Sequence, residues 1–283
     1  EGIGYYQTAY PLYVLLLTIS TAGFPVAVAK LVSEKSALGD HRGAHKVFKV
    51  AFLGMLIAGI LTSIFVFTNA KNIVTKWENP DAYYALIALV PALFFVPIMS
   101  AFRGYFQGRQ TMTPTALSQI IEQLFRVIAG LMLTYYLLDM GLPIAAGGAS
   151  FGGSIGAFAG ALAMTIIYFS KRGEIKKEVE TSIGEEESVE KIVKDLLIIA
   201  IPITIGAAIV PIMNSIDAFL VFRRLESVGF SKTEANSLFG QLTGHAQTLI
   251  NLPLIFSKTT IHILNSNFSI FKFVCILLDI AFQ

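Results

Sequence analysis

Polar side chains that could bind an anion interrupt a long apolar segment at residues 115–138. Gln119, Glu122, Gln123 and Arg126 follow at i, i+3, i+4 and i+7, so a helix would carry them on one face. A charge at bilayer depth costs at least about 2.5 kcal/mol, so it usually faces a protein interior or a watery cavity and often marks a transport path. The alternative is that Glu122 and Arg126 simply neutralise each other across one turn while packing helices together.

The composition places this segment in a membrane. Hydrophobic residues make up 54% of the chain and charged residues 14%, whereas soluble domains carry roughly 25% charged residues. Long apolar runs predict an all-α, polytopic helical bundle. The predicted spans are residues 8–29, 47–70, 82–102, 115–138, 143–170, 196–222 and 235–256, and a last apolar segment, 268–282, is short for a span.

Loop charges orient the predicted bundle. The loops within residues 30–46, 103–109 and 171–194 are rich in Lys and Arg, and the positive-inside rule places them in the cytoplasm. The loops near residues 71–81 and 139 lack this excess and should be external. Arg223, Arg224 and Lys232 break the alternation. Either these arginines line a cavity mouth, or one of the last two spans is assigned wrongly.

The polar stretch 171–195, rich in Glu and Lys, predicts a partly helical, solvated cytoplasmic linker between two lobes. Residues 1–170 would form a first membrane lobe with five helices, and residues 196–256 the start of a second. Residues 257–283 lose the small-residue texture of the earlier spans, and we interpret them as a frameshifted or aberrant end. Because the chain starts at Glu1 with no n-region or cleavage site, it is expected to be a piece of a longer protein.

The span at 143–170 carries glycines four residues apart, at Gly148, Gly152, Gly156 and Gly160. On a helix they form a ridge without side chains, which allows a second helix to approach closely. We therefore predict a packing role for this ridge and assign it no chemistry.

No catalytic constellation is present in the sequence: it contains neither a GxSxG motif nor a Walker loop. The histidines form no metal-ligand motif, and the lone Cys275 excludes an internal disulfide framework. No basic stripe suggests nucleic-acid binding. We expect neither an enzyme nor a cofactor.

Two further polar residues in the later spans have open interpretations. Asp217 shares a helix face with Asn214, and it could bind a coupling cation, pair with an arginine, or cap the turn at Arg223 and Arg224. His245 could respond to protons, or it could be a hydrogen-bonded packing histidine.

Several segments resemble a known family. They are FRGYFQGR at 102–109, MTPTA at 112–116, the polar face at 119–126, AGFP at 22–25, and NSID at 214–217 with Arg223 and Arg224 after it. Over about residues 2–253 the chain resembles the multidrug/oligosaccharidyl-lipid/polysaccharide exporter superfamily. Within it, the chain looks most like the group of stage V sporulation protein B and the MurJ-type lipid II flippases.

The resemblance implies two pseudo-symmetric lobes around a central cavity, of which this chain would hold most of the first lobe, without its first helix. It implies a multi-pass protein of the bacterial cell membrane that moves a lipid-linked oligosaccharide pyrophosphate. Arg126 is the predicted intramembrane ligand of the pyrophosphate, because its fork of donors suits phosphate oxygens. The other candidates are Glu122 to hold Arg126, Gln119 and Gln123 for sugar hydroxyls, Lys30, Arg103 and Arg109 at the cytoplasmic rim, and Asp217. The span at 8–29 contains no arginine, which departs from the pattern of the Gram-negative flippases.

Three alternatives to the flippase interpretation remain open. A cation-coupled multidrug exporter of the same superfamily needs an acidic cation site in the first lobe, but Glu122 has an arginine beside it. A polytopic membrane enzyme acting on lipid-linked sugars needs a sizeable external loop with acids or histidines, and the predicted external loops are short. A third possibility is a non-functional fragment.

Overall fold

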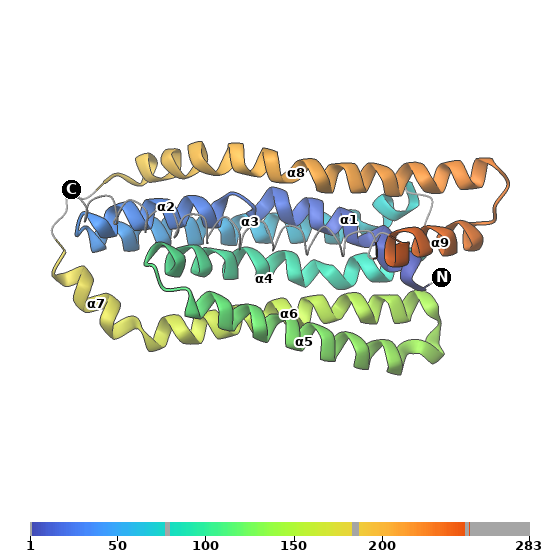
Figure 1. The fold of residues 1–283 in the computed structure, drawn as a ribbon, viewed down its shortest axis with the longest axis horizontal. Helices are drawn as coiled ribbons and strands as arrows, with labels where there is room; N and C mark the ends of the chain where they lie inside the picture. The colour runs from blue at the N-terminus through green and yellow to red at the C-terminus, as the bar shows by residue number, and fades with distance from the viewer. Residues whose placement is uncertain (1, 77–79, 183–186, 247–248, 250–283) are drawn as a thin grey trace, which may run out of the picture.

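The computed structural model describes residues 2–76, 80–182, 187–246 and 249 (Figure 1). Within this part of the chain the regular structure is entirely helical, with no strand. The α-helices are α1 (Gly2–Thr21), α2 (Phe24–Ala37), α3 (His41–Lys76), α4 (Tyr83–Gly108), α5 (Thr113–Leu137), α6 (Leu142–Ser170), α7 (Arg172–Glu180), α8 (Val189–Ser227) and α9 (Lys232–Gly240). Short 3₁₀ turns at Pro80–Ala82 and Leu138–Met140 precede α4 and α6, and a π-helical turn, Gln241–Ala246, follows α9.

Among the described residues, 6 helical segments are long and apolar enough to cross a membrane. They are Ala9–Ala37, His41–Lys76, Pro80–Gly108, Thr113–Met140, Leu142–Ser170 and Val189–Val221. The prediction of an all-α, polytopic membrane bundle is therefore confirmed, and the chain is a multi-pass membrane protein.

The first span is broken into α1 and α2, although the apolar pattern predicts one continuous helix. The break lies at Ala22 and Gly23, directly before Pro25 near the start of α2. The backbone N–H of Gly23 donates to Thr204 Oγ1 on α8 at 3.1 Å, so a polar side chain satisfies a group that the helix break leaves free. This contact links the first span to α8, which is 181 residues away in sequence.

The helices run back and forth along one axis, so successive connections alternate between the two ends (Figure 1). The connections α2–α3, α4–α5 and α6–α7 lie together at one end, and we propose that this end faces the cytoplasm because these are the Lys- and Arg-rich loops; we call it the cytoplasmic end. The α8–α9 connection lies at the opposite end. Arg224 is exposed there, and the side chain of Arg223 lies outside the described part.

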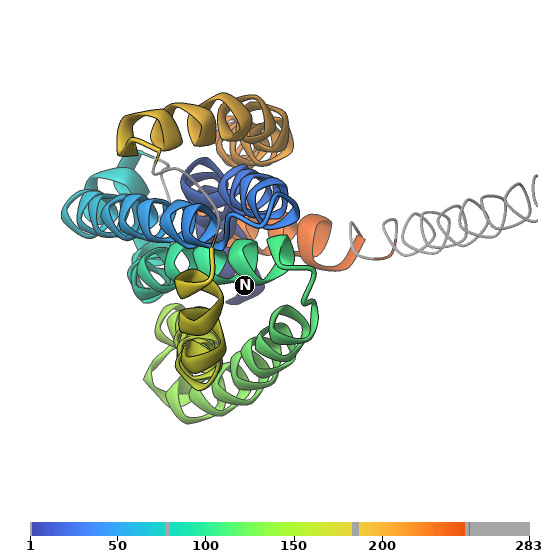
Figure 2. The ribbon, with the colours of Figure 1, turned by 90° about the vertical axis from the view of Figure 1, so that its left-hand side faces the viewer.

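Helix α8 lies along one side of the bundle and the α5–α6 pair along the other, with α1 to α4 between them (Figure 2). One core cluster includes Val28, Phe48, Phe102 and Ile175. Toward the other end, a second cluster includes Tyr13, Val66, Leu86 and Leu89. These apolar contacts hold α4 in the centre of the bundle.

Part of the polar linker is helical and packs on the bundle. Residues 172–180 form α7, whose Ile175 is buried in the core, and α8 already begins at Val189. Of the predicted span 235–256, the structure describes α9 and the π-helical turn. The remainder of that span, apart from 249, and the tail at 257–283 lie outside the described residues.

Candidate functional site

The glycine ridge of α6 packs directly on the backbone of α5, as the spacing of these glycines predicts. A Cβ atom added at Gly156 would lie 2.5 Å from the Glu122 carbonyl oxygen and 2.9 Å from Arg126 Cβ. A Cβ at Gly152 would lie 2.6 Å from both the Arg126 carbonyl oxygen and Gly130 Cα. The two helices can approach this closely only because these positions have no side chain, and the approach fixes the part of α5 that carries Glu122 and Arg126.

Glu122 joins two arginines in a buried ion cluster. Arg126 Nη2 on the same helix donates to Glu122 Oε1 at 2.7 Å, and Arg103 Nη2 on α4 donates to Glu122 Oε2 at 3.0 Å. Arg103 Nε also donates to Ser118 Oγ at 3.0 Å. We call Arg103, Ser118, Glu122 and Arg126 the buried charge cluster. With two guanidinium groups and one carboxylate, it carries a net charge of +1.

Arg103 lies near the end of α4, and its side chain packs against α5. The apolar run predicts that the helix ends at Phe102, but α4 continues to Gly108 and includes Arg103. Only 14% of its side chain is exposed. A guanidinium at this depth needs a counter-charge, and Glu122 supplies it.

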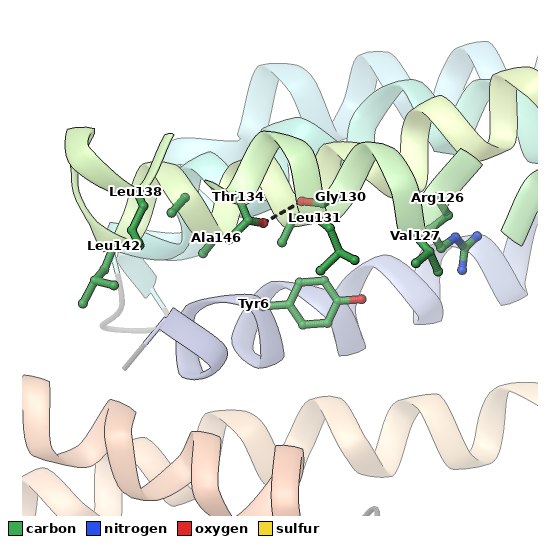
Figure 3. A pocket seen from close by; sticks show the side chains of 11 residues that line it. Tyr6, Arg126, Val127, Gly130, Leu131, Thr134, Leu138, Leu142 and Ala146 are labelled. Carbon is green, nitrogen blue, oxygen red and sulfur yellow. Dashed lines mark hydrogen bonds between the residues drawn. The ribbon is translucent and has the colours of Figure 1, made fainter. Parts of the chain in front are cut away.

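Arg126 is the more accessible of the two arginines. Its side chain is 31% exposed, against 8% for Glu122. No described residue forms a hydrogen bond with the buried Arg126 Nε. Arg126 also lines a cavity of about 650 Å³ between α1, α5 and α6. Figure 3 shows its guanidinium at one end of this cavity and the Tyr6 ring of α1 beside the wall of α5.

The two glutamines of the polar face lie beside this cavity. Gln119 and Gln123 are exposed and line a groove of about 530 Å³ on α5, together with Val127, which also lines the cavity. The face predicted to carry four polar residues is therefore divided. Glu122 points into the protein, whereas the two amides point toward open space.

The other candidate residues lie apart from this cluster. Arg109 Nη2 donates to both carboxylate oxygens of Glu178 on α7, at 2.9 and 2.7 Å, and Arg109 Cζ lies 5.5 Å from the centre of the Tyr105 ring. Lys30 is exposed and pairs with Glu34 along α2 at 3.7 Å. Asp217 is exposed on α8. The side chain of His245 lies outside the described part.

The site contains two further residues that were not predicted from the sequence. Tyr6 lines the cavity, and Ser118 anchors Arg103. The signal for Ser118 is its place four residues before Glu122, which puts both on one helix face. In the segment 102–109, the glycines pack against α2: a Cβ at Gly104 would lie 2.8 Å from the Pro25 carbonyl oxygen.

A second group of charges closes the cytoplasmic end, and we call it the cytoplasmic clasp: Lys35, Asp40, Lys46 and Glu187. Lys35 Nζ lies 2.8 Å from Glu187 Oε2 and 3.7 Å from Asp40 Oδ2. Lys46 Nζ donates to the backbone carbonyl of Glu187 at 2.7 Å. The hydrogen bond from Lys35, followed by that from Lys191, holds the pKa of Glu187 below its ordinary value. The clasp connects the α2–α3 region to the segment that leads into α8.

Comparison with known proteins reveals a family match. The sequence matches the polysaccharide biosynthesis protein family over residues 1–260. It is 32% identical over 258 residues to the stage V sporulation protein B of Bacillus subtilis (strain 168), covering 89% of this chain and 49% of that protein. It is also 32% identical over 266 residues to the lipid II flippase MurJ of the same strain, with 89% and 49% coverage.

A third relative, the uncharacterized membrane protein YabM of the same strain, is 29% identical over 260 residues, covering 90% of this chain and 47% of that protein. The chain spans about half the length of the curated relatives it matches. No solved structure matches it significantly.

Proposed function

The chain belongs to the polysaccharide biosynthesis protein family, and we propose that it contributes the anion-receiving half of a flippase for lipid-linked cell-wall or polysaccharide precursors. A lipid II-like molecule is the preferred substrate. In this proposal residues 1–170 form one lobe, 171–195 link the lobes, and α8 begins the second. The similarity to the lipid II flippase MurJ of Bacillus subtilis supports this choice of substrate class.

The observation that carries the proposal is the surplus positive charge at the cavity wall. Glu122 neutralises one of its two arginines, and the other charge is available to a ligand. A lipid-linked sugar must bring its pyrophosphate through a medium of low dielectric constant, where an unpaired anion is costly. The planar guanidinium of Arg126 can donate to two phosphate oxygens at once.

In the proposed mechanism, Glu122 positions Arg126 and partly releases it when the substrate arrives. Arg103, which is itself anchored by Ser118, remains with Glu122, so the carboxylate is not left without a partner when Arg126 turns toward the phosphate. Gln119 and Gln123 donate and accept hydrogen bonds with the sugar hydroxyls along the adjacent groove. The cavity around Leu131, Leu138 and Leu142 offers apolar surface to the lipid.

Alternating access requires the first lobe to move relative to the second. The helix break at Ala22 and Gly23 lies where the first span meets α8, and a Cβ at Gly23 would collide with the Ala200 carbonyl. Breaks of this kind in transporter helices are points about which one lobe can rock against the other. We propose this junction as such a point.

The buried charge cluster also argues against the cation-coupled multidrug exporter. Both carboxylate oxygens of Glu122 already accept a hydrogen bond from an arginine. A coupling cation would have to displace a guanidinium from each oxygen that it bound.

The test is rescue of bacteria depleted of their lipid II flippase by the full gene that encodes this chain. We expect the wild type and Arg42→Ala to rescue growth, because Arg42 is an exposed arginine in the first turn of α3, away from the buried charge cluster. Arg126→Ala should fail to rescue although it inserts in the membrane at the wild-type level. Rescue by Arg126→Ala would refute its role in the transport path. No rescue by a well-inserted wild type would refute lipid II as the substrate.

A further inference from the structure

A second cavity, of about 440 Å³, lies at the cytoplasmic end where α3, α6 and α7 meet. It is separate from the transport site, and none of its lining residues belongs to the buried charge cluster. Lys49, Arg172 and Lys176 line it, together with His45 and Tyr168, and the described lining contains no carboxylate. We call this cavity the interfacial basic pocket.

The basic side chains of this pocket are largely without acidic partners in the described part of the chain. Within the described part of the chain, Lys49 and Arg172 are exposed and take part in none of the ion pairs. Lys176 pairs with Glu180 at 3.7 Å through solvent-exposed side chains. By contrast, Lys35 and Arg109 at the same end are both held by acids. Lys49 and Arg172 can therefore bind an anion without first breaking an ion pair within the described part of the chain.

Apolar side chains form the other part of the pocket wall and continue away from it along α6. Ile175 and Val179 pack α7 against the bundle and form part of the wall, and Phe169 is 57% exposed beside them. From the pocket, exposed apolar side chains continue along α6 at Ile166, Leu162 and Phe158. These positions are three or four residues apart, so they form one stripe on the helix surface.

A matching stripe runs along α3. It begins one turn beyond Lys49 and consists of exposed Leu53, Ile57, Leu61 and Ile64. Both helices thus present a basic group at the cytoplasmic end and an apolar surface that extends toward the bilayer centre. A phospholipid has the matching arrangement, because its phosphate lies at the membrane interface and its acyl chains point toward the bilayer centre.

We propose that the interfacial basic pocket binds the phosphate of an anionic phospholipid from the cytoplasmic leaflet. Lys49 and Arg172 bind the phosphate oxygens, and the acyl chains lie along the two apolar stripes. Basic pockets between membrane helices on the cytoplasmic side bind lipid head groups by this combination of charge and apolar contact. The bound lipid would connect α7 to α3 and so hold the linker against the first lobe.

The experiment measures lipid binding to the purified full-length protein by native mass spectrometry, with phosphatidylglycerol as the probe and phosphatidylcholine as the zwitterionic reference. We expect wild type to prefer phosphatidylglycerol. Each cation removed should weaken its binding about fivefold, so Lys49→Gln/Arg172→Gln should lose roughly 25-fold and Arg172→Gln alone about fivefold. Binding of phosphatidylcholine should not change.

Two control variants separate this site from general surface charge. Lys71→Gln/Lys76→Gln removes two exposed cations at the opposite end of α3 and should leave the preference intact. Lys49→Arg/Arg172→Lys keeps the charge and should retain binding. Equal phosphatidylglycerol affinity of wild type and Lys49→Gln/Arg172→Gln would overturn the proposal. Displacement of the lipid by millimolar inorganic phosphate would show that a free anion is the ligand instead. Because no transport is measured, the result is independent of the proposed flippase activity.

Discussion

The buried charge cluster and the cytoplasmic clasp use the same kinds of contact but differ in charge balance. The shortest ion pair measures 2.7 Å in the cluster and 2.8 Å in the clasp. Side-chain exposure is also similar, at 8–31% in the cluster and 13–28% for the clasp residues Lys35, Asp40 and Glu187. In the clasp, however, one lysine, Lys35, lies between two carboxylates, whereas in the cluster one carboxylate, Glu122, lies between two arginines.

This difference separates a contact that holds helices together from one that can also receive a ligand. A lysine that is held between two carboxylates has little to offer an anion. A group with excess positive charge at bilayer depth is costly, and an anionic ligand that pairs with this charge lowers the cost. The position of Arg126 on the wall of a cavity, with an unpartnered Nε, fits the second description.

The largest effect is expected from removing the single acid of the cluster. Glu122→Gln leaves the largely buried Arg103 and the partly exposed Arg126 without a counter-charge, and we expect the free energy of unfolding to fall by about 3–5 kcal/mol. Denaturant unfolding of the purified protein in mild detergent would measure it. The double variant Glu122→Gln/Arg103→Gln should recover part of the loss. A loss below about 1 kcal/mol for Glu122→Gln would contradict the importance of charge balance here.

The next effect tests how α6 positions the cluster. In Gly156→Ala the new methyl group meets the backbone of Glu122, so α5 and α6 must separate, and we expect about 1–3 kcal/mol of destabilisation. Gly206→Ala in α8 is the matched control, because nothing lies within 4 Å of its added Cβ. It should be neutral, or stabilising by up to about 1 kcal/mol. Equal behaviour of the two variants would show that close helix approach does not govern this site.

A smaller effect is expected at the clasp. Lys35→Gln removes an ion pair near the water, and we expect a loss of about 1 kcal/mol that shrinks as salt is added. Unfolding in low and high salt would measure both quantities. A loss as large as that of Glu122→Gln would remove the distinction between the two regions.

The smallest effect is a pH dependence of the clasp. Because the pKa of Glu187 is lower in the folded than in the unfolded state, its stabilising contribution is present above the unfolded pKa. It is lost as the pH falls through the folded pKa. Wild type should therefore be more stable than Glu187→Gln at neutral pH, and the difference should disappear in acid. A difference that grows on acidification would contradict the assigned shift.

Much of this fold is predictable because its signals are local. Six of the predicted spans correspond to helices of sufficient length and apolarity, since each is a continuous run in the sequence. The glycine ridge follows from its spacing of four residues, and its close contact with α5 is confirmed. The pairing of Glu122 with Arg126 follows equally from one turn of helix.

What the sequence did not reveal depends on contacts between distant segments. Arg103 reaches Glu122 from another helix, and the loop charges alone placed it at the rim. Pro25 predicts a kinked or loosened helix near the break at Gly23, but the contact with Thr204 that stabilises the break comes from far along the chain and has no local signal. The ion pair of Arg109 likewise has no local signal, because its partner Glu178 lies on α7.

The most direct test of the central claim is the affinity of the full-length protein for lipid II, compared between wild type and Arg126→Gln. If Arg126 receives the pyrophosphate, the variant should bind roughly 10- to 100-fold more weakly, since hydrogen bonds to charged groups contribute about 1.5–3 kcal/mol each. Undecaprenol, which lacks the pyrophosphate, should bind wild type and variant alike, and Arg42→Gln should behave as wild type. Equal affinity of Arg126→Gln and wild type for lipid II would contradict the account.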